Sequence, residues 1–415
     1  MEPSSKPVSI VLAGIGGYGG FYLNILLDET DPATYRIVGV VDQSPERCGR
    51  LDELKARNIP VYPALEDFYT RHEAELAILS TPIHFHCPHI CCALSHGSNV
   101  LCEKPVCATI QEARRIIETR DQTGRFVAIG YQWSFNDAIQ KLKQDIISGL
   151  YGKPLRLKTV ALQPRPFSYY DRNNWAGALD DGNANWILDS PINNATAHFL
   201  QNMFYVLGDR VDRSARPARV TAELYRAHDI TNFDTGAVRI FTEEGVEMLH
   251  IASHVTDQRL SLEFLYEFER GSVHYNDERR AIYARFPNGK EKIYGNPFDN
   301  LENKLRDSIA AVRGRTRIVC GPEAATSMTL AVNGIQESMP RIIDFPKNLL
   351  KRKNENDREF LFVENLDNYL IQCYRERTLP SELDIPWARS GHEIDLTSYD
   401  TFPSAAFVAA RESAR

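Results

Sequence analysis

Three glycines near the start of the chain have the spacing of a phosphate-binding turn. Gly14, Gly16 and Gly19 follow an apolar run and precede an apolar stretch of helical type, which gives the pattern G-x-G-x-x-G. In such a turn the first glycine allows the tight bend, the second lets a pyrophosphate approach the backbone, and the third allows close packing of helix on strand. The N–H groups at the start of the helix would face the phosphates. The same spacing also suits a turn that binds nothing, so its context decides.

Asp42 favours a dinucleotide at this turn. It follows a second apolar, β-branched run at residues 35–41, about 20 residues beyond the glycines. An acidic residue at this position can accept hydrogen bonds from the ribose hydroxyls of the adenosine, and it would repel a 2′-phosphate. We therefore predict NAD as the cofactor. The alternative for Asp42 is an N-cap in a loop.

Imidazole and thiolate side chains, which are zinc ligands, gather between residues 84 and 102. They are His84, His86, Cys87, His89, Cys91, Cys92, His96 and Cys102. The group contains no C-x-x-C pair, and Cys91 and Cys92 would point in different directions on a helix. We predict no metal site and a packing role for these cysteines.

Residues 165–175 combine arginines with aromatic side chains, and Trp186 follows them. Aromatic faces stack on the C–H patches of a pyranose ring, while planar donors bind its hydroxyl groups. We predict that Arg172 and Trp175 contact a substrate. An ordinary interface or loop cluster is the alternative.

Short buried strands alternate with helices around the glycine turn and Asp42. We expect strands at 9–12, 35–41, 76–79, 99–102 and 126–131, and helices at 21–27, 88–95, 110–123 and 137–148. Strands that alternate with helices form a parallel sheet covered on both faces. The sequence therefore predicts an α/β protein whose residues 1–132 form a Rossmann domain with a doubly wound parallel sheet.

Strands dominate the second half of the chain. We expect strands at 155–162, 219–228, 237–242, 247–254, 260–269 and 281–285, with helices at 193–207, 299–313 and 322–338. Hairpin-like turns at 243–245 and 287–289 favour a large open, mainly antiparallel sheet with one face exposed or covered by a partner. We predict an α/β domain at 133–340, self-association through the open face, and a charged, proline-punctuated C-terminal extension at 341–415.

Composition narrows the classes of partner. The 415 residues carry a formal charge of −7 without a basic run, which argues against nucleic acid or an anionic membrane as the main partner. We expect a cytoplasmic protein with a small-molecule substrate, because the start lacks a secretory pattern and no stretch approaches the ~20 apolar residues of a membrane span. The eight cysteines lack the framework of a small secreted domain, which indicates reduced thiols.

An ordered series of motifs resembles the Gfo/Idh/MocA oxidoreductases, a family named for glucose-fructose oxidoreductase, inositol dehydrogenase and rhizopine catabolism proteins. The resemblance covers most of residues 7–340. Its carriers are the glycine turn, Asp42, Ser80-Thr81-Pro82 with His86, Glu103-Lys104-Pro105, Gly130-Tyr131-Gln132, the closure at 149–154, and His198 leading to Gly208. The resemblance implies hydride transfer between a nicotinamide cofactor and a sugar, cyclitol or related alcohol, in a homodimer or homotetramer.

The family also implies roles for individual residues. Oxidation of a secondary alcohol needs a cation near the developing alkoxide and a base for the hydroxyl proton, roles that fit Lys104 and His198. The cofactor-binding positions are Gly14, Ile15, Gly16, Tyr18, Gly19, Asp42, Ser80, Thr81, Pro82, His86, Glu103, Lys104 and Gln132. The substrate positions are Lys104, Arg172, Trp175, Asn194 and His198.

The chain departs from the family pattern around His198. Many members carry aspartate, glycine and aspartate where this sequence has Asn194, Thr196 and Gln201. Amides orient hydroxyl groups but cannot act as bases, so a carboxylate beside His198 is missing unless Asp189 supplies it. The usual asparagine after Thr81-Pro82 is Ile83, and Trp133-Ser134 replaces a frequent basic residue. The substrate stays open, as do two alternatives: an NAD-dependent glycosidase that uses transient oxidation and elimination, and a non-catalytic cofactor-binding sensor.

Overall fold

The computed structural model describes residues 6–28, 33–183 and 185–412, which form two compact units. The N-terminal unit consists of Met1–Cys107, Gln111–Asn136 and Asn300–Thr326. The C-terminal unit consists of Ala108–Ile110, Asp137–Asp299 and Ser327–Arg415. Residues 300–326 therefore pack with the N-terminal unit, although they follow most of the C-terminal unit in sequence.

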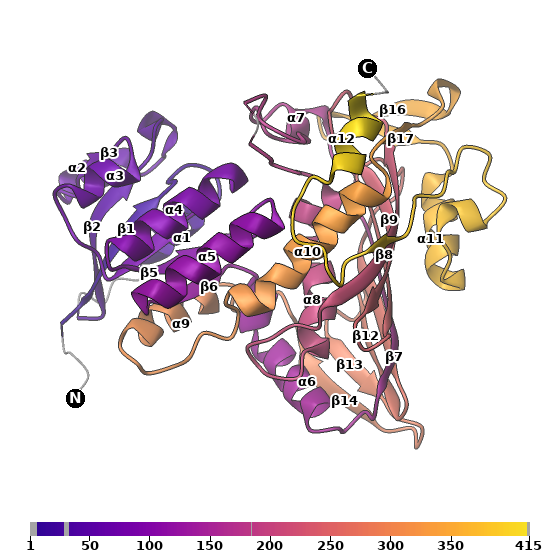
Figure 1. Cartoon of the computed structure of the whole chain (residues 1–415), viewed down its shortest axis with the longest axis horizontal. Helices are drawn as coiled ribbons and strands as arrows, with labels where there is room; N and C mark the ends of the chain where they lie inside the picture. The colour runs from indigo at the N-terminus through magenta and orange to yellow at the C-terminus, as the bar shows by residue number, and fades with distance from the viewer. Residues whose placement is uncertain (1–5, 29–32, 184, 413–415) are drawn as a thin grey trace. The chain divides into compact units, whose positions relative to one another are not determined.

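A six-stranded parallel sheet forms the centre of the N-terminal unit, in the order β3-β2-β1-β4-β5-β6. The strands are β1 (Val8–Ala13), β2 (Tyr35–Val41), β3 (Val61–Tyr62), β4 (Leu76–Leu79), β5 (Asn99–Cys102) and β6 (Val127–Ile129). The helices are α1 (Gly19–Asp28), α2 (Leu51–Ala56), α3 (Leu65–Tyr69), α4 (His86–Ser95), α5 (Ile110–Thr123) and α9 (Asn303–Val312), shown in Figure 1. Every residue of β1 and β4 is buried, as expected for strands covered on both faces. The expected doubly wound parallel sheet is confirmed.

The strand order of this sheet reverses at β1, which lies between β2 and β4. Open α/β sheets bind ligands at such a point, beyond the carboxyl ends of the strands. There the N–H of Gly14 donates to the carbonyl of Val41, and the N–H of Ser80 donates to the carbonyl of Ala13, both at 2.8 Å. The segments that leave β1, β2 and β4 are therefore held together at the same edge.

The C-terminal unit contains a ten-stranded mixed sheet, in the order β14-β13-β12-β11-β7-β10-β9-β8-β15, with β18 also paired to β8. Its strands are β7 (Pro154–Leu162), β8 (Pro217–Arg226), β9 (Thr235–Thr242), β10 (Glu247–Ser253), β11 (Leu260–Phe268), β12 (Gly271–Asn276), β13 (Ile282–Arg285), β14 (Glu291–Gly295), β15 (Ile343–Asp344) and β18 (Ile394–Asp395). The pairs β7–β10 and β8–β15 are parallel, and the other pairs are antiparallel. The expected large, mainly antiparallel sheet is confirmed.

The helices α6 (Asp137–Ile147) and α8 (Ala197–Leu207) belong to this unit, as does α10 (Pro322–Ser338) from Ser327 onward. The prediction of one continuous helix at 193–207 is wrong, because a π-helical turn at Pro191–Ala195 precedes α8. The backbone N–H of Thr196 donates to the carbonyl of Pro191 at 2.8 Å, and its hydroxyl donates to the same carbonyl at 2.9 Å. This five-residue span is that of a π-turn, a feature often found at functional sites. Asn194 lies in this turn, and His198 lies in the first turn of α8.

The chain covers part of the sheet face that the sequence leaves open. Figure 1 shows α11 (Leu366–Glu376) on the side of the sheet opposite α8 and α10. Leu366, Leu370 and Cys373 of α11 are buried in one cluster with Val160 of β7 and Leu249 of β10. A partner is therefore not needed to cover this part of the face. The remaining elements are α7 (Phe167–Tyr170), β16 (Leu350–Glu355), β17 (Arg358–Val363) and α12 (Ala405–Glu412).

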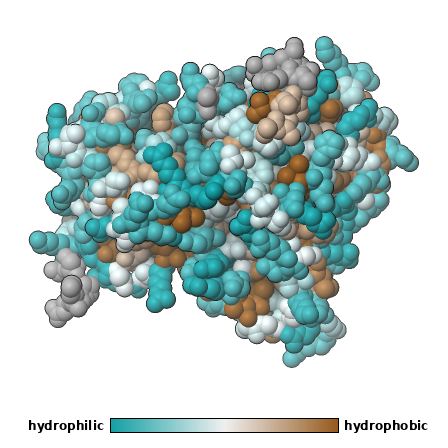
Figure 2. Space-filling model, in the orientation of Figure 1, coloured by the Kyte–Doolittle hydropathy of each residue, from teal (hydrophilic) through white to brown (hydrophobic). Residues whose placement is uncertain are grey.

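The surface is mostly polar on the face seen in Figure 2. Hydrophobic side chains lie there in small separate areas between hydrophilic ones. Within the described ranges, no helix is long and apolar enough to cross a bilayer.

Candidate functional site

Two of the three glycines in the turn after β1 are required by the packing of the turn itself. Gly14 has a φ of +82°, and a Cβ there would lie 2.4 Å from the carbonyl oxygen of Ser80. A Cβ on Gly19 would lie 1.8 Å from the carbonyl oxygen of Gly14. Both distances are far below van der Waals contact, so only glycine fits at these positions. The turn and the start of α1 therefore form one tightly packed bend.

Gly16 differs because protein atoms do not surround it. A Cβ at Gly16 would meet no heavy atom of the described residues within 4 Å, apart from its chain neighbours. The glycine leaves open space beside the backbone at the start of α1, where free N–H groups and the helix dipole favour an anion. These residues fit the pyrophosphate of a dinucleotide, as the glycine spacing predicts.

Asp42 holds this turn through its carboxylate. One oxygen, Oδ2, accepts hydrogen bonds from the backbone N–H of Ile15 at 2.8 Å and of Gly16 at 3.3 Å. The other, Oδ1, accepts from the N–H of Ser44 at 2.8 Å. A carboxylate has about four lone-pair positions, so Asp42 can still accept a ribose hydroxyl. The role in shaping the turn was not predicted, and the ribose contact stays a prediction.

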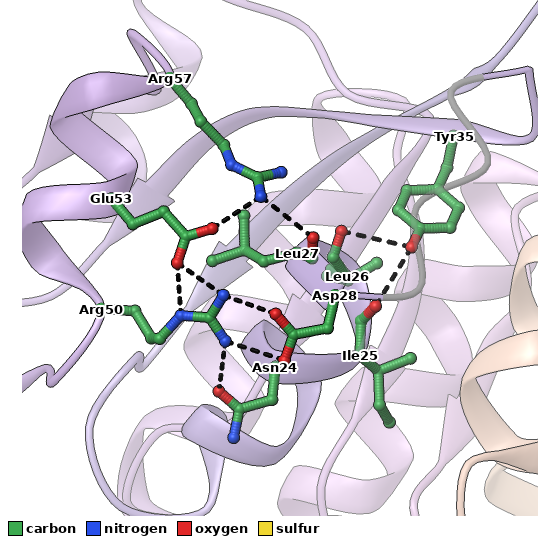
Figure 3. Close-up of polar contacts among 9 residues, drawn as sticks. All are labelled: Asn24, Ile25, Leu26, Leu27, Asp28, Tyr35, Arg50, Glu53 and Arg57. Carbon is green, nitrogen blue, oxygen red and sulfur yellow. Dashed lines mark hydrogen bonds and ion pairs between the residues drawn. The ribbon is translucent and has the colours of Figure 1, made fainter.

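The other end of α1 is anchored by the two arginines that flank α2, Arg50 before it and Arg57 after it, as Figure 3 shows. The guanidinium of Arg50 donates to Asp28 at 2.6 Å and 3.0 Å, to Asn24 at 3.1 Å and to Glu53 at 2.5 Å. Arg57 donates to the carbonyl of Leu27 at 3.2 Å. These contacts fix the last turn of the helix whose first turn borders Gly16.

His86 joins the segments that follow β4 and β5. Its ring is buried, with Nδ1 2.7 Å from the carbonyl oxygen of Pro105 and Nε2 2.8 Å from that of Thr81. Burial lowers the pKa of His86 below its ordinary value. The neutral ring carries one N–H, so it donates to one of these two carbonyls at a time. This position suits a residue that holds the Thr81 and Pro105 segments in place beside the cofactor turn.

Glu103 forms a buried ion pair with Lys304 of α9. The Nζ of Lys304 lies 2.5 Å from Oε1 of Glu103, and the hydroxyl of Tyr22 donates to the same oxygen at 2.5 Å. Burial raises the pKa of Glu103, but Lys304 and Tyr22 outweigh it and hold this pKa below its ordinary value. A Cβ on Gly130 would lie 2.8 Å from the same oxygen, so this glycine is also required. The pair fixes the residue immediately before Lys104.

Lys304 was missed in the sequence, although a signal for it exists. It lies on the buried face of α9 with Leu305, Ser308 and Ile309. A lysine on the apolar face of a helix needs a buried partner, because burying an unpaired charge is very costly. That partner is Glu103, about two hundred residues earlier in the chain, and the helical periodicity alone does not identify it.

Tyr18 links the glycine turn to the end of β6. Its hydroxyl donates to Oε1 of Gln132 at 3.2 Å and accepts from Nζ of Lys304 at 3.0 Å. The predicted cofactor residues of this unit therefore follow adjacent strands of one sheet. Gly14 follows β1, Asp42 follows β2, Ser80 follows β4, Glu103 and Lys104 follow β5, and Gln132 follows β6.

The C-terminal unit places Asn194 beside Asp189. The side-chain amide of Asn194 donates to Oδ1 of Asp189 at 2.7 Å, and the N–H of Gly177 donates to Oδ2 at 2.6 Å. Asp189 is buried, so its charge depends on these donors. His198 lies one helical turn after Asn194. Asp189, which was considered from the sequence as a replacement for the aspartate that many family members carry near His198, therefore orients Asn194 and the backbone at Gly177.

Arg172 and Trp175, which are both predicted to contact a substrate, lie close together. The guanidinium carbon of Arg172 lies 3.8 Å from the ring centroid of Tyr169 and 5.2 Å from that of Trp175. A cation over aromatic faces is a favourable contact. The contact orders an exposed arginine beside two aromatic side chains, which is a suitable surface for a sugar ring.

The histidines and cysteines between residues 84 and 102 have structural contacts. Nδ1 of His96 lies 2.9 Å from the carbonyl oxygen of Cys92, and its ring stacks on Tyr69. Nδ1 of His89 lies 3.3 Å from the hydroxyl of Thr81. Among residues 6–28, 33–183 and 185–412, no three His, Cys, Asp or Glu side chains are grouped to hold a metal ion. All eight cysteines are free thiols.

Comparison with known proteins identifies relatives of the N-terminal unit. Residues 8–131 match the family described as oxidoreductase family, NAD-binding Rossmann fold. The chain is 31% identical over 150 residues to 2,7-anhydro-N-acetylneuraminate hydratase of Mediterraneibacter gnavus, covering 36% of this chain and 38% of that protein. It is 26% identical over 156 residues to inositol 2-dehydrogenase of Rubrobacter xylanophilus, covering 37% and 44%. The chain thus spans less than half the length of these curated relatives.

Solved structures share the fold of both units. The WlbA dehydrogenase from Bordetella pertussis, in complex with NADH and UDP-GlcNAcA, has a TM-score of 0.66 and 19% identity, covering 80% of this chain and 96% of that chain. An inositol dehydrogenase homolog from Azotobacter vinelandii, complexed with NADH and myo-inositol, has a TM-score of 0.63 and 16% identity, covering 81% and 97%. At this identity the likeness concerns the fold alone.

Proposed function

We propose that this chain, which belongs to the Gfo/Idh/MocA oxidoreductase family through residues 8–131, transfers hydride between NAD and a hydroxyl group of a sugar, sugar derivative or cyclitol. The relative named inositol 2-dehydrogenase and the structures complexed with NADH and a sugar nucleotide or inositol support this substrate class. The two alternatives, a redox-assisted glycosidase and a non-catalytic sensor, are not favoured by these relatives.

The observation that carries the proposal is the contrast between Gly16 and the other two glycines of the G-x-G-x-x-G pattern, Gly14 and Gly19. Gly14 and Gly19 are glycine because backbone carbonyls leave no room for a Cβ. Gly16 has open space instead, so protein packing does not explain it. A ligand phosphate that approaches the backbone does explain it.

Bound NAD supplies a hydride acceptor for the carbon that is oxidised. Within the proposal, Lys104 stabilises the negative charge that develops on the substrate oxygen, and His198 takes the hydroxyl proton. Asn194, oriented by Asp189, donates to or accepts from a substrate hydroxyl. In the reverse direction, His198 returns the proton.

The first test measures NADH binding by fluorescence titration. Gly16→Val puts a branched side chain into the open space, and its Cβ would meet no protein atom within 4 Å, so the variant should fold and lose NADH affinity by about a hundredfold. Gly49→Ala is the matched control, because Gly49 also has no atom within 4 Å of a Cβ and no positive φ. Unchanged affinity in Gly16→Val would contradict the proposal.

The second test screens sugars, sugar derivatives and cyclitols for a change in the nicotinamide absorbance band. Turnover that falls strongly in Lys104→Ala while NADH affinity persists would support the proposal. Release of an aglycone from glycosides without net NADH would favour the glycosidase alternative instead. Binding of NADH with no chemistry on any substrate would favour the sensor. The cytoplasmic location and the homodimer or homotetramer stay predictions.

A further inference from the structure

Two arginines lie over the ring of Tyr169 in α7, and a third arginine lies close to one of them. The guanidinium carbon of Arg172 lies 3.8 Å from the ring centroid of Tyr169, and that of Arg165 lies 4.9 Å from the same centroid. Arg259 donates to the carbonyl of Pro164 at 3.2 Å, directly before Arg165. Guanidinium groups from two segments, residues 165–172 and Arg259, therefore lie near one another and near His254.

Protein carboxylates do not neutralise this cluster. Within the described part of the chain, Arg165, Arg172 and Arg259 form no ion pair, whereas Arg226 and Arg239 on β8 and β9 are paired with Asp344 and Glu382. The positive charge of the cluster is therefore available to a ligand.

The two acidic groups that act on neighbouring Tyr170 are Asp189 and Asp234, and both have other donors. Asp189 accepts from Gly177 and Asn194. Asp234 accepts from the backbone N–H of His228 at 2.8 Å, and Nδ1 of His228 lies 3.0 Å from the same oxygen. Among the described residues, neither carboxylate forms an ion pair with Arg165, Arg172 or Arg259.

A buried histidine adds a second, independent observation. The N–H of Arg165 donates to the carbonyl of His254 at 3.0 Å, so the two residues are adjacent. His254 is 1% exposed, and its Nδ1 lies 2.8 Å from the hydroxyl of Tyr170. Its Nε2, like Nε of Arg165, is buried and has no hydrogen-bond partner among the described residues. Such groups are costly unless something pairs with them.

The tautomer of His254 decides whether its second ring nitrogen, Nε2, is a donor. Burial lowers the pKa of His254 well below its ordinary value, and Arg165 lowers it further, so the ring is neutral. In the tautomer in which Tyr170 donates to Nδ1, Nε2 carries the N–H. Arginines and an imidazole N–H are all donors, which is the set that an anionic oxygen requires.

We propose that Arg165, Arg172, Arg259 and His254 bind an anionic group, a carboxylate or a phosphate ester, carried by the sugar substrate. Guanidinium groups bind both kinds of anion in bidentate geometry, and the unbalanced positive charge attracts them. That the anionic group belongs to the substrate, and not to another ligand, rests on the proposed function.

The cluster is connected to the residues expected to contact that substrate. Gly177 packs against the ring of Tyr170, where a Cβ would lie 3.0 Å from Cδ1, and its N–H donates to Asp189. Asp189 in turn accepts from Asn194, one turn before His198. An anion bound at the arginines would therefore hold its sugar on the His198 side of the C-terminal unit.

Calorimetric titration of the full-length, NADH-loaded protein tests this inference with D-glucuronate, glucose phosphate and D-glucose. At least one acidic probe should bind about tenfold or more tightly than D-glucose, since hydrogen bonds to charged groups contribute this much. Arg172→Gln, an exposed position that should not disturb folding, should remove this advantage, so that in the variant the acidic probe binds no more tightly than D-glucose. Arg279→Gln is the matched control, because Arg279 lies 3.8 Å over the ring of Tyr283 elsewhere in the sheet.

The two acidic probes separate the anion classes. Tighter binding of D-glucuronate indicates a carboxylate, and tighter binding of glucose phosphate indicates a phosphate ester. Binding of neither acidic probe, or acidic binding that Arg172→Gln leaves unchanged, would overturn the inference. Arg172-dependent binding without hydride transfer to any substrate would count against the proposed function and leave the anion site standing. Hydride transfer with neutral sugars alone would support the proposed function and count against the anion site.

Discussion

The two units hold their predicted site residues by different means. In the N-terminal unit, Gly14, Asp42 and Glu103 follow neighbouring or nearby strands of one parallel sheet, and the strand order brings them to the same edge. In the C-terminal unit, Arg172 and Asn194 lie on irregular segments that are held by side-chain contacts. Backbone geometry of the first kind leaves a recognisable motif, whereas contacts of the second kind do not. Substitutions should therefore act on folding and cofactor binding in the first unit, and on substrate binding in the second.

Lys304→Met should produce the largest effect, in the N-terminal unit. The Lys304 side chain is fully buried against Glu103, so the substitution leaves a buried carboxylate without its cation. Such a loss costs about 3–5 kcal/mol of the free energy of unfolding. Urea denaturation at neutral pH measures it. The double variant Glu103→Gln with Lys304→Met is the control, because removing both charges should recover most of the loss.

Acidification should narrow the gap between the wild type and Lys304→Met. In the wild type the pKa of Glu103 lies below its ordinary value. The ion pair therefore contributes to the free energy of unfolding at pH values above the ordinary pKa of a glutamate. This contribution is lost as the pH falls through the lowered pKa. In the variant, Lys304 no longer opposes the effect of burial, so the pKa of Glu103 rises and protonation relieves the penalty at higher pH. A gap that stays constant down to acid unfolding would contradict the assignment of the loss to Glu103.

The parallel sheet could be predicted from sequence because each strand is a short apolar run that ends at a recognisable motif. The observed β2, β4 and β5 coincide with the expected residues 35–41, 76–79 and 99–102. The two-residue β3 (Val61–Tyr62) was missed, because so short a strand has no periodicity to recognise. The contacts of Asp42 with the glycine turn were missed for another reason: they depend on how β1 and β2 pair.

The sequence of the C-terminal extension contains the pattern of an amphipathic helix, which was not among the predicted elements. Buried residues of α11 include Leu366, Leu370, Cys373 and Tyr374, which recur at helical spacing. This pattern predicts a helix with one apolar face, but the surface that it covers cannot be deduced from it. The face of β7 and β10 was expected to be open for the same reason: α11, which covers it, lies more than a hundred residues after either strand in the chain.

Asp189→Asn tests the C-terminal side of the comparison and should have an intermediate effect. An asparagine can accept from only one of the two donors, Asn194 and Gly177, through its single oxygen, and its amide would face the other. A buried donor without an acceptor costs about 1–3 kcal/mol. We expect kcat/KM to fall while NADH affinity is unchanged. Asp181→Asn, in an exposed loop where Asp181 also accepts from backbone N–H groups, is the control. A fall in NADH affinity would break the separation between the units.

Arg50→Gln should have the smallest effect, although Arg50 donates to Asn24, Asp28 and Glu53, as Figure 3 shows. Its partner Asp28 is 57% exposed, and exposed ion pairs contribute little because water already solvates both charges. Arg50 holds the pKa values of Asp28 and Glu53 below their ordinary values. Any contribution of these ion pairs to the free energy of unfolding is therefore present at pH values above the ordinary carboxylate pKa and is lost as the pH falls.

Salt separates the exposed pair from the buried one. We expect any shift of the urea midpoint in Arg50→Gln to vanish in about 1 M salt, where screening acts within about 3 Å. The shift in Lys304→Met should persist, because ions do not reach the buried Glu103. Equal sensitivity of the two variants to salt would show that burial does not determine how much Lys304 contributes to the free energy of unfolding. NADH affinity, measured for the same variants, would show whether loss of Lys304 also disturbs the glycine turn.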